Sequence, residues 1–361
     1  MNRPIRLGPI ATAAPPQTLD RAASQQVADL LTPPDVPRHV LARLHDRVGI
    51  DTRGVAVRQA DGSIPLYGIA ADPTQSSPRR PTTAERMQAY AAAAPPLAID
   101  AGRAAITQAA VDPASITHVV TASCTGFGAP GVDLAVVEAL TLDPSVQRTH
   151  VGFMGCHAAV NALRVAAAYA RESPAHRVLV ACVEVSTVHF HEDSRLDRVI
   201  SNILFADGAA AVVVGTGLDA SFPELAATGA RLIADSAGSM AWHVGDPGFE
   251  MTLAADVPDR IADALGHWVD ATLANHDLTR DGIGGWAIHP GGPRVIDAVA
   301  TTLGLPESAA EPSRAVLREH GNMSSATLLH ILRRFADADR PRPWVGLAFG
   351  PGLAGELLLV R

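Results

Sequence analysis

Cys156 has the sequence surroundings of a nucleophilic thiol. It lies between an apolar stretch typical of a buried strand, residues 149–153, and an alanine-rich segment with leucine and valine at helical spacing, residues 158–171. This order predicts a helix over residues 156–171 with the thiol in its first turn, where backbone N–H groups and the helix dipole stabilise an anion. We therefore expect a lowered thiol pKa and a reactive cysteine. A buried structural cysteine is the alternative that this segment leaves open.

Two further turns carry polar side chains. His289 ends a short apolar strand predicted over residues 285–288, and the next four residues, PGGP, force a turn that exposes the imidazole. Asn322 lies in a glycine-containing turn ahead of an apolar helix predicted over residues 324–335. A surface histidine and an asparagine helix cap are the alternative interpretations.

Together, a cysteine, a histidine and an asparagine on such turns suit thioester chemistry. The thiolate attacks an acyl carbonyl, and the histidine can stabilise the thiolate as an ion pair. Histidine Nε2 and asparagine Nδ2 can both donate hydrogen bonds to an oxyanion. The same donors can stabilise the enolate that forms when a malonyl thioester loses carbon dioxide.

The composition excludes several other classes of function. The chain has 361 residues, 47% of them hydrophobic, and a formal charge of −8 without a basic tract, which argues against a nucleic-acid partner. All 29 basic residues are arginine. A chain without lysine forms no lysine Schiff base and contains no Walker A phosphate loop.

The cysteine content indicates a reducing compartment. The three cysteines, Cys124, Cys156 and Cys182, form no C-x-x-C pair, and their odd number argues against a disulfide framework. Residues 1–20 contain no apolar run of signal-peptide length, and no clean 18-residue apolar span is present. We therefore expect a cytoplasmic protein without membrane insertion.

Strands alternate with helices from about residue 116 onward, which is typical of α/β proteins with largely parallel sheets covered on both faces. Strands are predicted over residues 117–122, 149–153, 178–182, 209–215, 285–288, 344–348 and 356–360, and further helices over 83–110, 132–140, 258–275 and 293–303. The order of elements in the first half is loosely repeated in the second. We expect two similar halves, residues 1–220 with the cysteine and residues 221–361 with the histidine and asparagine, and a site between them.

Five short motifs resemble those of the chalcone-synthase-like or type III polyketide synthases, over about residues 40–361. They occur along the chain in the same order as in that family. The pair GC at 155–156 is similar to the nucleophile motif, HPGGP at 289–293 to the histidine motif and GNMSS at 321–325 to the asparagine motif. The run LFADGAA at 204–210 resembles the segment with a gatekeeper phenylalanine, here Phe205. The run AFGPGL at 348–353 is similar to the GFGPG loop, with Ala348 in place of glycine.

The resemblance implies a duplicated thiolase-like αβαβα layered fold and a specific reaction. A starter acyl group passes from coenzyme A to Cys156, and His289 and Asn322 promote decarboxylation of malonyl-CoA. The enolate attacks the acyl thioester over several rounds, and the chain cyclises to a pyrone, a resorcinol or a related phenolic product. Phe205 separates the coenzyme A tunnel from the cavity. No metal or redox cofactor is implied.

Other positions take their expected roles from the same resemblance. The cavity residues are Cys124, Ser186, His189, Trp242, Met251 and Ser324, and the cyclisation loop consists of Ala348, Phe349, Gly350, Pro351 and Gly352. Cys124 is either a second reactive thiol or a cavity wall. The bulk of Trp242 and His189 argues against the plant starter, and the bacterial members of the family suggest a fatty acyl starter and an alkylpyrone or alkylresorcinol product.

Coenzyme A and a second copy of the chain are the expected partners. Arg43 and Arg47 are spaced i, i+4 on one face of a helix and align with basic residues at the family's tunnel mouth, where arginine suits phosphate. A solvated helix face is the alternative. The family also implies a homodimer, in which a loop near residues 129–131 reaches the partner's cavity.

Two other functions are compatible with a Cys/His/Asn set. One is a β-ketoacyl-ACP synthase III-like enzyme that starts fatty acid synthesis. That family usually has glutamine and alanine after the histidine and lacks the FGPG loop, whereas this chain has PGGP and the loop. The other is a non-catalytic acyl-binding relative, against which the intact Cys156, His289 and Asn322 argue.

Overall fold

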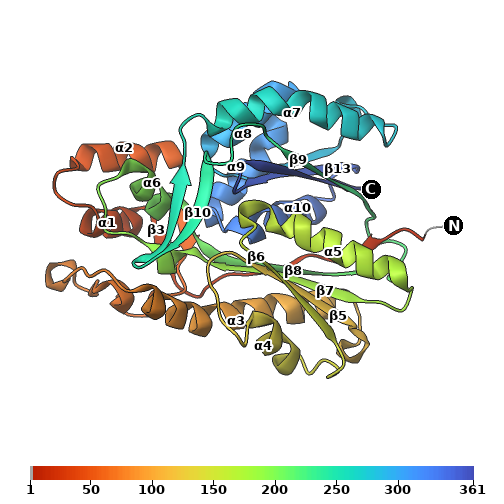
Figure 1. The fold of residues 1–361 in the computed structure, drawn as a ribbon, viewed down its shortest axis with the longest axis horizontal. Helices are drawn as coiled ribbons and strands as arrows, with labels where there is room; N and C mark the ends of the chain where they lie inside the picture. The colour runs from red at the N-terminus through yellow and green to blue at the C-terminus, as the bar shows by residue number, and fades with distance from the viewer. Residues whose placement is uncertain (1–2) are drawn as a thin grey trace.

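Two β-sheets and three sets of helices alternate in five layers, in the order helix, sheet, helix, sheet, helix (Figure 1). The computed structural model describes residues 3–361. In Figure 1, α3 and α4 cover the outer face of the first sheet and α7 and α8 that of the second, with α5 and α10 between the sheets. This is the thiolase-like layered fold that the motifs imply.

The first sheet has the strand order β1-β8-β7-β5-β6, with β2 also paired to β8. Its strands are β1 (Arg6–Leu7), β2 (Ala11–Ala13), β5 (His118–Ser123), β6 (Gln147–Gly152), β7 (Val178–Val185) and β8 (Asp207–Gly215). Strands β5, β7 and β8 are buried along their whole length, as expected for apolar runs covered on both faces.

The second sheet has the order β12-β13-β14-β9. Its strands are β9 (Leu225–Leu232), β12 (Gly285–Ile288), β13 (Trp344–Gly350) and β14 (Ala354–Val360). Two small sheets lie outside this core, one of β3 (Thr18–Asp20) with β4 (Thr52–Gly54), the other a hairpin of β10 (Met240–Gly245) with β11 (Gly248–Leu253). The expectation of largely parallel sheets is wrong for both large sheets. In the first, β5 runs parallel to β6 and β7, but β1, β2 and β7 each pair antiparallel with β8. In the second, only β12 and β13 run parallel, because β13 to β14 and β14 to β9 are antiparallel pairs.

The α-helices are α1 (Arg21–Leu31), α2 (Arg38–Val48), α3 (Thr83–Gln108), α4 (Val132–Ala139), α5 (Ala158–Glu172), α6 (Leu196–Leu204), α7 (Val257–Ala274), α8 (Pro293–Leu303), α9 (Glu307–His320) and α10 (Thr327–Asp337). Short 3₁₀ helices occupy η1 (Pro65–Tyr67), η2 (Pro73–Gln75), η3 (Pro113–Ser115), η4 (Gly155–His157), η5 (Ser186–His189), η6 (Arg280–Gly282) and η7 (Ser324–Ala326). Three of these, η4, η5 and η7, carry residues of the expected site.

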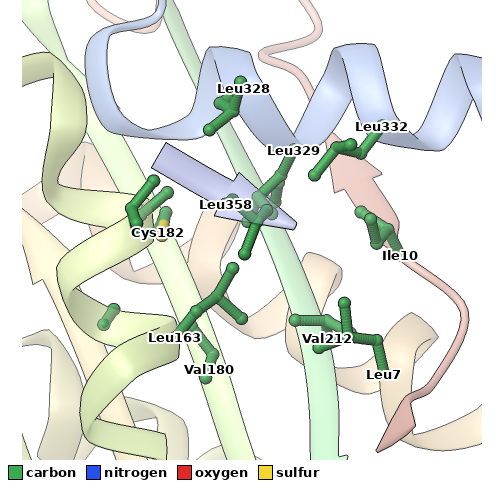
Figure 2. Close-up of a cluster of buried hydrophobic side chains, with 14 of the residues drawn as sticks. Leu7, Ile10, Leu163, Val180, Cys182, Val212, Leu328, Leu329, Leu332 and Leu358 are labelled. Atoms are coloured by element: carbon green, nitrogen blue, oxygen red, sulfur yellow. The ribbon is translucent and has the colours of Figure 1, made fainter. Parts of the chain in front are cut away.

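The middle layer joins the two halves through a continuous apolar core. Figure 2 shows Leu163 of α5 and Leu328 of α10 in one cluster with Leu358 of the second sheet and Val212 of the first. Each of these side chains is fully buried, and burying a leucine or valine stabilises a fold by about 1.5–3 kcal/mol. The same packing fixes the start of α5 relative to the start of α10, and these helix starts bear the cysteine and asparagine turns.

Candidate active site

The turn that carries Cys156 links β6 to α5. Phe153 and Gly155 adopt left-handed backbone conformations, with φ of 57° and 69°, and Cys156 follows in η4. The predicted helix over residues 156–171 is thus a 3₁₀ turn followed by an α-helix that begins only at Ala158. Glycine is required at position 155, because a Cβ there would collide with the Pro351 ring and the positive φ would be strained.

The predicted cyclisation loop packs directly on this turn. Pro351 contacts Gly155, and a Cβ at Gly350 would collide with the ring of His157. Phe349 and Pro351 line the cavities described below, whereas Ala348 is fully buried within β13. The loop therefore supports the cysteine turn as well as forming part of the cavity wall.

His289 lies where β12 ends, at the edge of the second sheet. Its backbone N–H donates to the Leu347 carbonyl of the neighbouring strand at 2.7 Å, which fixes the imidazole beyond the strand end. The side chain is 1% exposed, and neither Nδ1 nor Nε2 has a hydrogen-bond partner among the described residues. Buried ring nitrogens without partners are rare unless a ligand completes them.

Asn322 is held by its backbone and by one side-chain oxygen. Its N–H donates to the Leu204 carbonyl at 3.0 Å and its carbonyl accepts from Ala206 N–H at 2.9 Å, so it is paired with the segment around Phe205. Its Oδ1 accepts from Ser324 N–H at 2.9 Å. That bond fixes the amide orientation and leaves Nδ2, which is buried without a partner in the described part of the chain, as a free donor.

One cavity of about 380 Å³ brings the predicted catalytic residues together. Cys156, His289 and Asn322 line it, together with Phe205 and Phe349. The three residues come from η4, from the end of β12 and from the turn after α9, and the first of these segments lies more than a hundred residues before the other two. The histidine and the asparagine thus present two unpartnered polar groups to the cavity that the thiol also lines.

The expected lowering of the Cys156 pKa is wrong for the ligand-free site. The side chain is partly exposed to the cavity, but burial by neighbouring atoms raises its pKa to about 12, and the side chains of Ser324 and Asn322 offset only part of that rise. Burial, and secondarily His157, lowers the pKa of His289 to about 3. Desolvation outweighs the helix N-terminus here, because Cys156 precedes the first residue of α5 and does not lie within it. In the cavity that both residues line, the thiol and the imidazole are therefore neutral.

A second cavity, of about 420 Å³, adjoins the first across Cys156 and Phe205. The predicted cavity residues Cys124, Ser186, Trp242, Met251 and Ser324 all line it, with Pro351. The indole Nε1–H of Trp242 donates to the Cys124 carbonyl at 3.0 Å, which holds the ring in place. His189 does not line this cavity but lies behind Trp242, with its ring centroid 5.7 Å from that of the indole.

Cys124 is positioned as a wall of this cavity. Its sulfur accepts from the Gly155 N–H at 2.9 Å, immediately before the cysteine of the nucleophile motif. Burial, followed by the nearby Glu184 carboxylate, raises the pKa of this thiol well above its usual range. These contacts favour the cavity-wall interpretation over a second reactive thiol.

Two buried charged residues in the site were missed by sequence analysis. Glu184 accepts hydrogen bonds from Cys124 N–H, the Thr125 hydroxyl and the Ser325 hydroxyl, and so ties the Cys124 turn to the asparagine motif. Arg53, which is 2% exposed, donates to the Phe205 carbonyl at 2.6 Å. A glutamate within the apolar run VLVACVEV of β7 was the available signal for the first, whereas no local pattern marks the second.

Arg43 and Arg47 lie apart from these cavities. Both are exposed on α2, and neither guanidinium forms a salt bridge within residues 3–361. Helix α2 packs beside α6, the helix that leads into Phe205, and Figure 1 shows α1, α2 and α6 gathered at one end of the molecule. The two arginines thus lie on a helix that packs beside the helix leading into Phe205.

Comparison with known proteins identifies the family. Residues 56–218 match the model of the N-terminal domain of chalcone and stilbene synthases, and residues 224–361 match that of their C-terminal domain. The chain belongs to the chalcone and stilbene synthase family. It is a type III polyketide synthase, an enzyme that joins acyl-CoA units by decarboxylative condensation. A fatty-acid-type condensing enzyme is not favoured.

Two named relatives align with nearly all of this chain. The α-pyrone synthesis polyketide synthase-like Pks18 of Mycobacterium tuberculosis is 32% identical, over 97% of this chain and 89% of the relative. The 1,3,6,8-tetrahydroxynaphthalene synthase of Streptomyces peucetius is also 32% identical, over 100% of this chain and 94% of the relative. Among solved structures, PKS-I of the brown alga Ectocarpus siliculosus superposes with a TM-score of 0.89 at 28% identity, covering 100% and 99% of the two chains.

Two negative observations complete the description of the synthase. Within residues 3–361, no three histidine, cysteine or acidic side chains gather in a way that could hold a metal ion. In the same residues, no helix has the length and apolar character needed to cross a membrane.

Proposed function

We propose that Cys156 carries the acyl chain and that His289 and Asn322 stabilise the oxyanion and enolate intermediates. The observation that carries this assignment is the pair of unpartnered groups, the His289 imidazole and Asn322 Nδ2, in the cavity that the thiol lines. A buried donor without a partner costs free energy in the empty site and is compensated when an oxyanion binds there. Removing one such donor raises a barrier by about 3–4 kcal/mol.

Because the Cys156 thiol and the His289 imidazole are both neutral, the first step includes a proton transfer between them. As the Cys156 sulfur attacks the starter thioester, neutral His289 accepts the thiol proton, and the resulting imidazolium and Asn322 Nδ2 donate to the tetrahedral oxyanion. Collapse of this intermediate breaks the carbon–sulfur bond to coenzyme A, whose thiolate takes the proton from the imidazolium. Malonyl-CoA then loses carbon dioxide, and the same two donors hold the enolate oxygen. The enolate carbon attacks the acyl carbonyl on Cys156, which breaks the carbon–sulfur bond to Cys156, releases that sulfur as a thiolate and leaves the lengthened chain on coenzyme A.

We propose that coenzyme A approaches from the side of α2 and α6. Arg43 and Arg47 are free to contact its phosphates, and Phe205 lines both cavities beside Cys156, as a gate would. The loop from Ala348 to Gly352 and the wall formed by Cys124, Trp242, Met251 and Ser324 shape the cyclisation. Named relatives make α-pyrones or a tetrahydroxynaphthalene, and a pyrone or a related phenolic product is proposed for this enzyme.

We also propose a homodimer that forms along β6. This strand is the last in its sheet, and its second edge has no strand partner within residues 3–361. Three apolar side chains are exposed near its end, namely Phe127 at 71%, Phe153 at 43% and Met154 at 38%. Exposed apolar side chains beside a free strand edge are a typical protein-binding surface. Sedimentation at micromolar concentration should show a dimer, and Phe127→Asp should weaken it.

We propose that the chain consists of two halves. Two family models support a division near residue 220, since the first ends at residue 218 and the second starts at residue 224. The first half bears the cysteine, and the second bears the histidine and the asparagine.

A cytoplasmic location is supported by three cysteines that are all free thiols. The proposed steps involve no metal or redox cofactor.

The test is a product analysis. The purified enzyme, incubated with malonyl-CoA and a set of acyl-CoA starters, should form cyclised polyketides that mass spectrometry detects, and Asn322→Ala should reduce their rate of formation by about 100-fold or more. Extension that requires malonyl-acyl carrier protein and fails with malonyl-CoA would instead support a fatty-acid-type condensing enzyme.

A further inference from the structure

A third cavity lies behind Trp242, next to the one that Cys156 lines. Its empty space, including the part at its opening, is about 330 Å³, and its walls include Ser186, His189, His191, Arg198, Asn202 and Phe249. Ser186, Phe205, Trp242 and Met251 line both this cavity and the adjoining one. An acyl group attached to Cys156 that extends past Trp242 therefore enters the third cavity.

Most polar side chains of this cavity already form hydrogen bonds within the protein. His189 contacts the Thr125 carbonyl through Nε2 at 2.7 Å and accepts from Phe249 N–H through Nδ1 at 3.1 Å. Asn202 exchanges two hydrogen bonds with the backbone of His191, at 2.9 and 2.7 Å. The Ser201 hydroxyl, which also lines the cavity, donates to the Asp197 carbonyl at 2.8 Å.

Two donors remain without a partner in the described residues. One is Oγ of Ser186, a side chain that is only 6% exposed. The other is Nε of Arg198, whose terminal nitrogens are already engaged by Asp193 and Glu250. Because two carboxylates balance its charge, this guanidinium suits a neutral carbonyl oxygen better than a second anion.

We propose that the third cavity is a subsite for the oxygen-bearing part of the acyl chain on Cys156, with Ser186 Oγ and Arg198 Nε donating to its carbonyl oxygens. The inference rests on the proposed role of Cys156. A chain that grows from malonyl units carries a keto oxygen on every second carbon, so it presents carbonyl acceptors at regular spacing, whereas an alkyl chain presents none. The subsite therefore favours short β-oxoacyl groups over alkyl groups of equal length, in contrast to the fatty acyl starter suggested by the family resemblance.

Acetoacetyl-CoA and butanoyl-CoA test this, because both deliver four carbons and differ in the keto oxygen. The rate of Cys156 acylation by each is measured by quenching and intact-protein mass spectrometry. Ser186→Ala should lower the ratio of the acetoacetyl to the butanoyl rate by about five- to tenfold, the loss of one hydrogen bond to a bound carbonyl. Its thermal midpoint should stay the same or rise, because the variant removes a buried hydroxyl that has no partner.

Ser201→Ala is the matched control, since its hydroxyl lines the same cavity but is already hydrogen-bonded. It should leave the ratio unchanged and lower the thermal midpoint slightly. An unchanged ratio in Ser186→Ala, or an equal loss with both thioesters, would overturn the subsite while leaving the role of Cys156 intact. If wild-type Cys156 is acylated by neither thioester, the proposed function is wrong, and the subsite with it.

Discussion

At the scale of the residue, burial sets the chemistry of the site, because it keeps both the Cys156 thiol and the His289 imidazole neutral. Cys156, His289 and Asn322 each lie at a turn with a recognisable local pattern, and all three line one cavity. The pKa of the thiol has the opposite shift from the one expected, since burial raises it. Desolvation depends on the atoms that distant segments bring around the thiol, so no local sequence pattern reports it.

His289→Gln separates the two roles of the imidazole. Glutamine can donate to an oxyanion but cannot accept the thiol proton, so acylation of Cys156 at pH 7.5 should fall by about 100-fold or more. Because only thiolate then reacts, the rate in the variant should rise about tenfold per pH unit above pH 7.5, whereas that of the wild type should change much less. Stopped acylation reactions at a series of pH values measure both. A variant rate that does not depend on pH would contradict proton transfer to His289.

At the scale of the element, apolar strands and helices were predictable, whereas strands of mixed polarity were not. The strand from Gly285 to Ile288 was predicted with its observed ends. The β10–β11 hairpin, which carries Trp242 and Met251, was missed because residues 240–253 have no long apolar run. The hairpin is held by tertiary contacts, including the stacking of Phe249 on His189 with ring centroids 4.4 Å apart. Local hydrophobic periodicity does not predict such contacts.

Helix α2 gives a prediction about substrate delivery. Replacing both Arg43 and Arg47 with alanine should raise KM for acyl-CoA by about tenfold, the loss of about 1.4 kcal/mol of phosphate contact, with little change in kcat. An N-acetylcysteamine thioester of the same acyl group lacks the nucleotide phosphates, so its kinetics should not change. Steady-state kinetics with the two substrates measures this. Equal effects on both would show that these arginines form only a solvated helix face.

At the scale of the whole molecule, the layered architecture followed from the resemblance, whereas the expected parallel strand directions were wrong in both large sheets. Alternating strands and helices do not distinguish a parallel crossover from the antiparallel return of β14 onto β13.

The fold also buries several histidines in the neutral state. Burial is the main cause in each case, and lowers the pKa of His45 to about 4 and those of His189, His289 and His330 to about 3.

These histidines predict destabilisation by acid. Their folded pKa values lie below the ordinary value, so their contribution to stability is present above pH 6.5 and is lost as the pH falls toward 3–4. Each lowers the free energy of unfolding by about 1.4 kcal/mol per pH unit below 6.5. Burial raises the pKa of Asp207 to about 6 and also raises that of Glu184, and these two carboxyl groups act in the opposite direction.

His330→Gln isolates one of these contributions. His330 lies on α10 and donates to the Ala209 carbonyl at 3.1 Å, a bond that glutamine can retain. Urea unfolding between pH 7.5 and pH 5 should show a smaller loss of stability in the variant, by about 1–2 kcal/mol at pH 5. Identical pH dependence in variant and wild type would contradict the assignment of a buried neutral histidine.

The central claim is that Cys156 carries the acyl chain, and intact-protein mass spectrometry tests it most directly. After incubation with acetyl-CoA, the wild type and a Cys182→Ala control, changed only in the apolar core (Figure 2), should each gain one acetyl group. Digestion should locate that group on Cys156, and malonyl-CoA should convert it to released product. Cys156→Ala should neither gain the group nor form product. An acyl group on Cys124, or cyclised product from Cys156→Ala, would contradict the account.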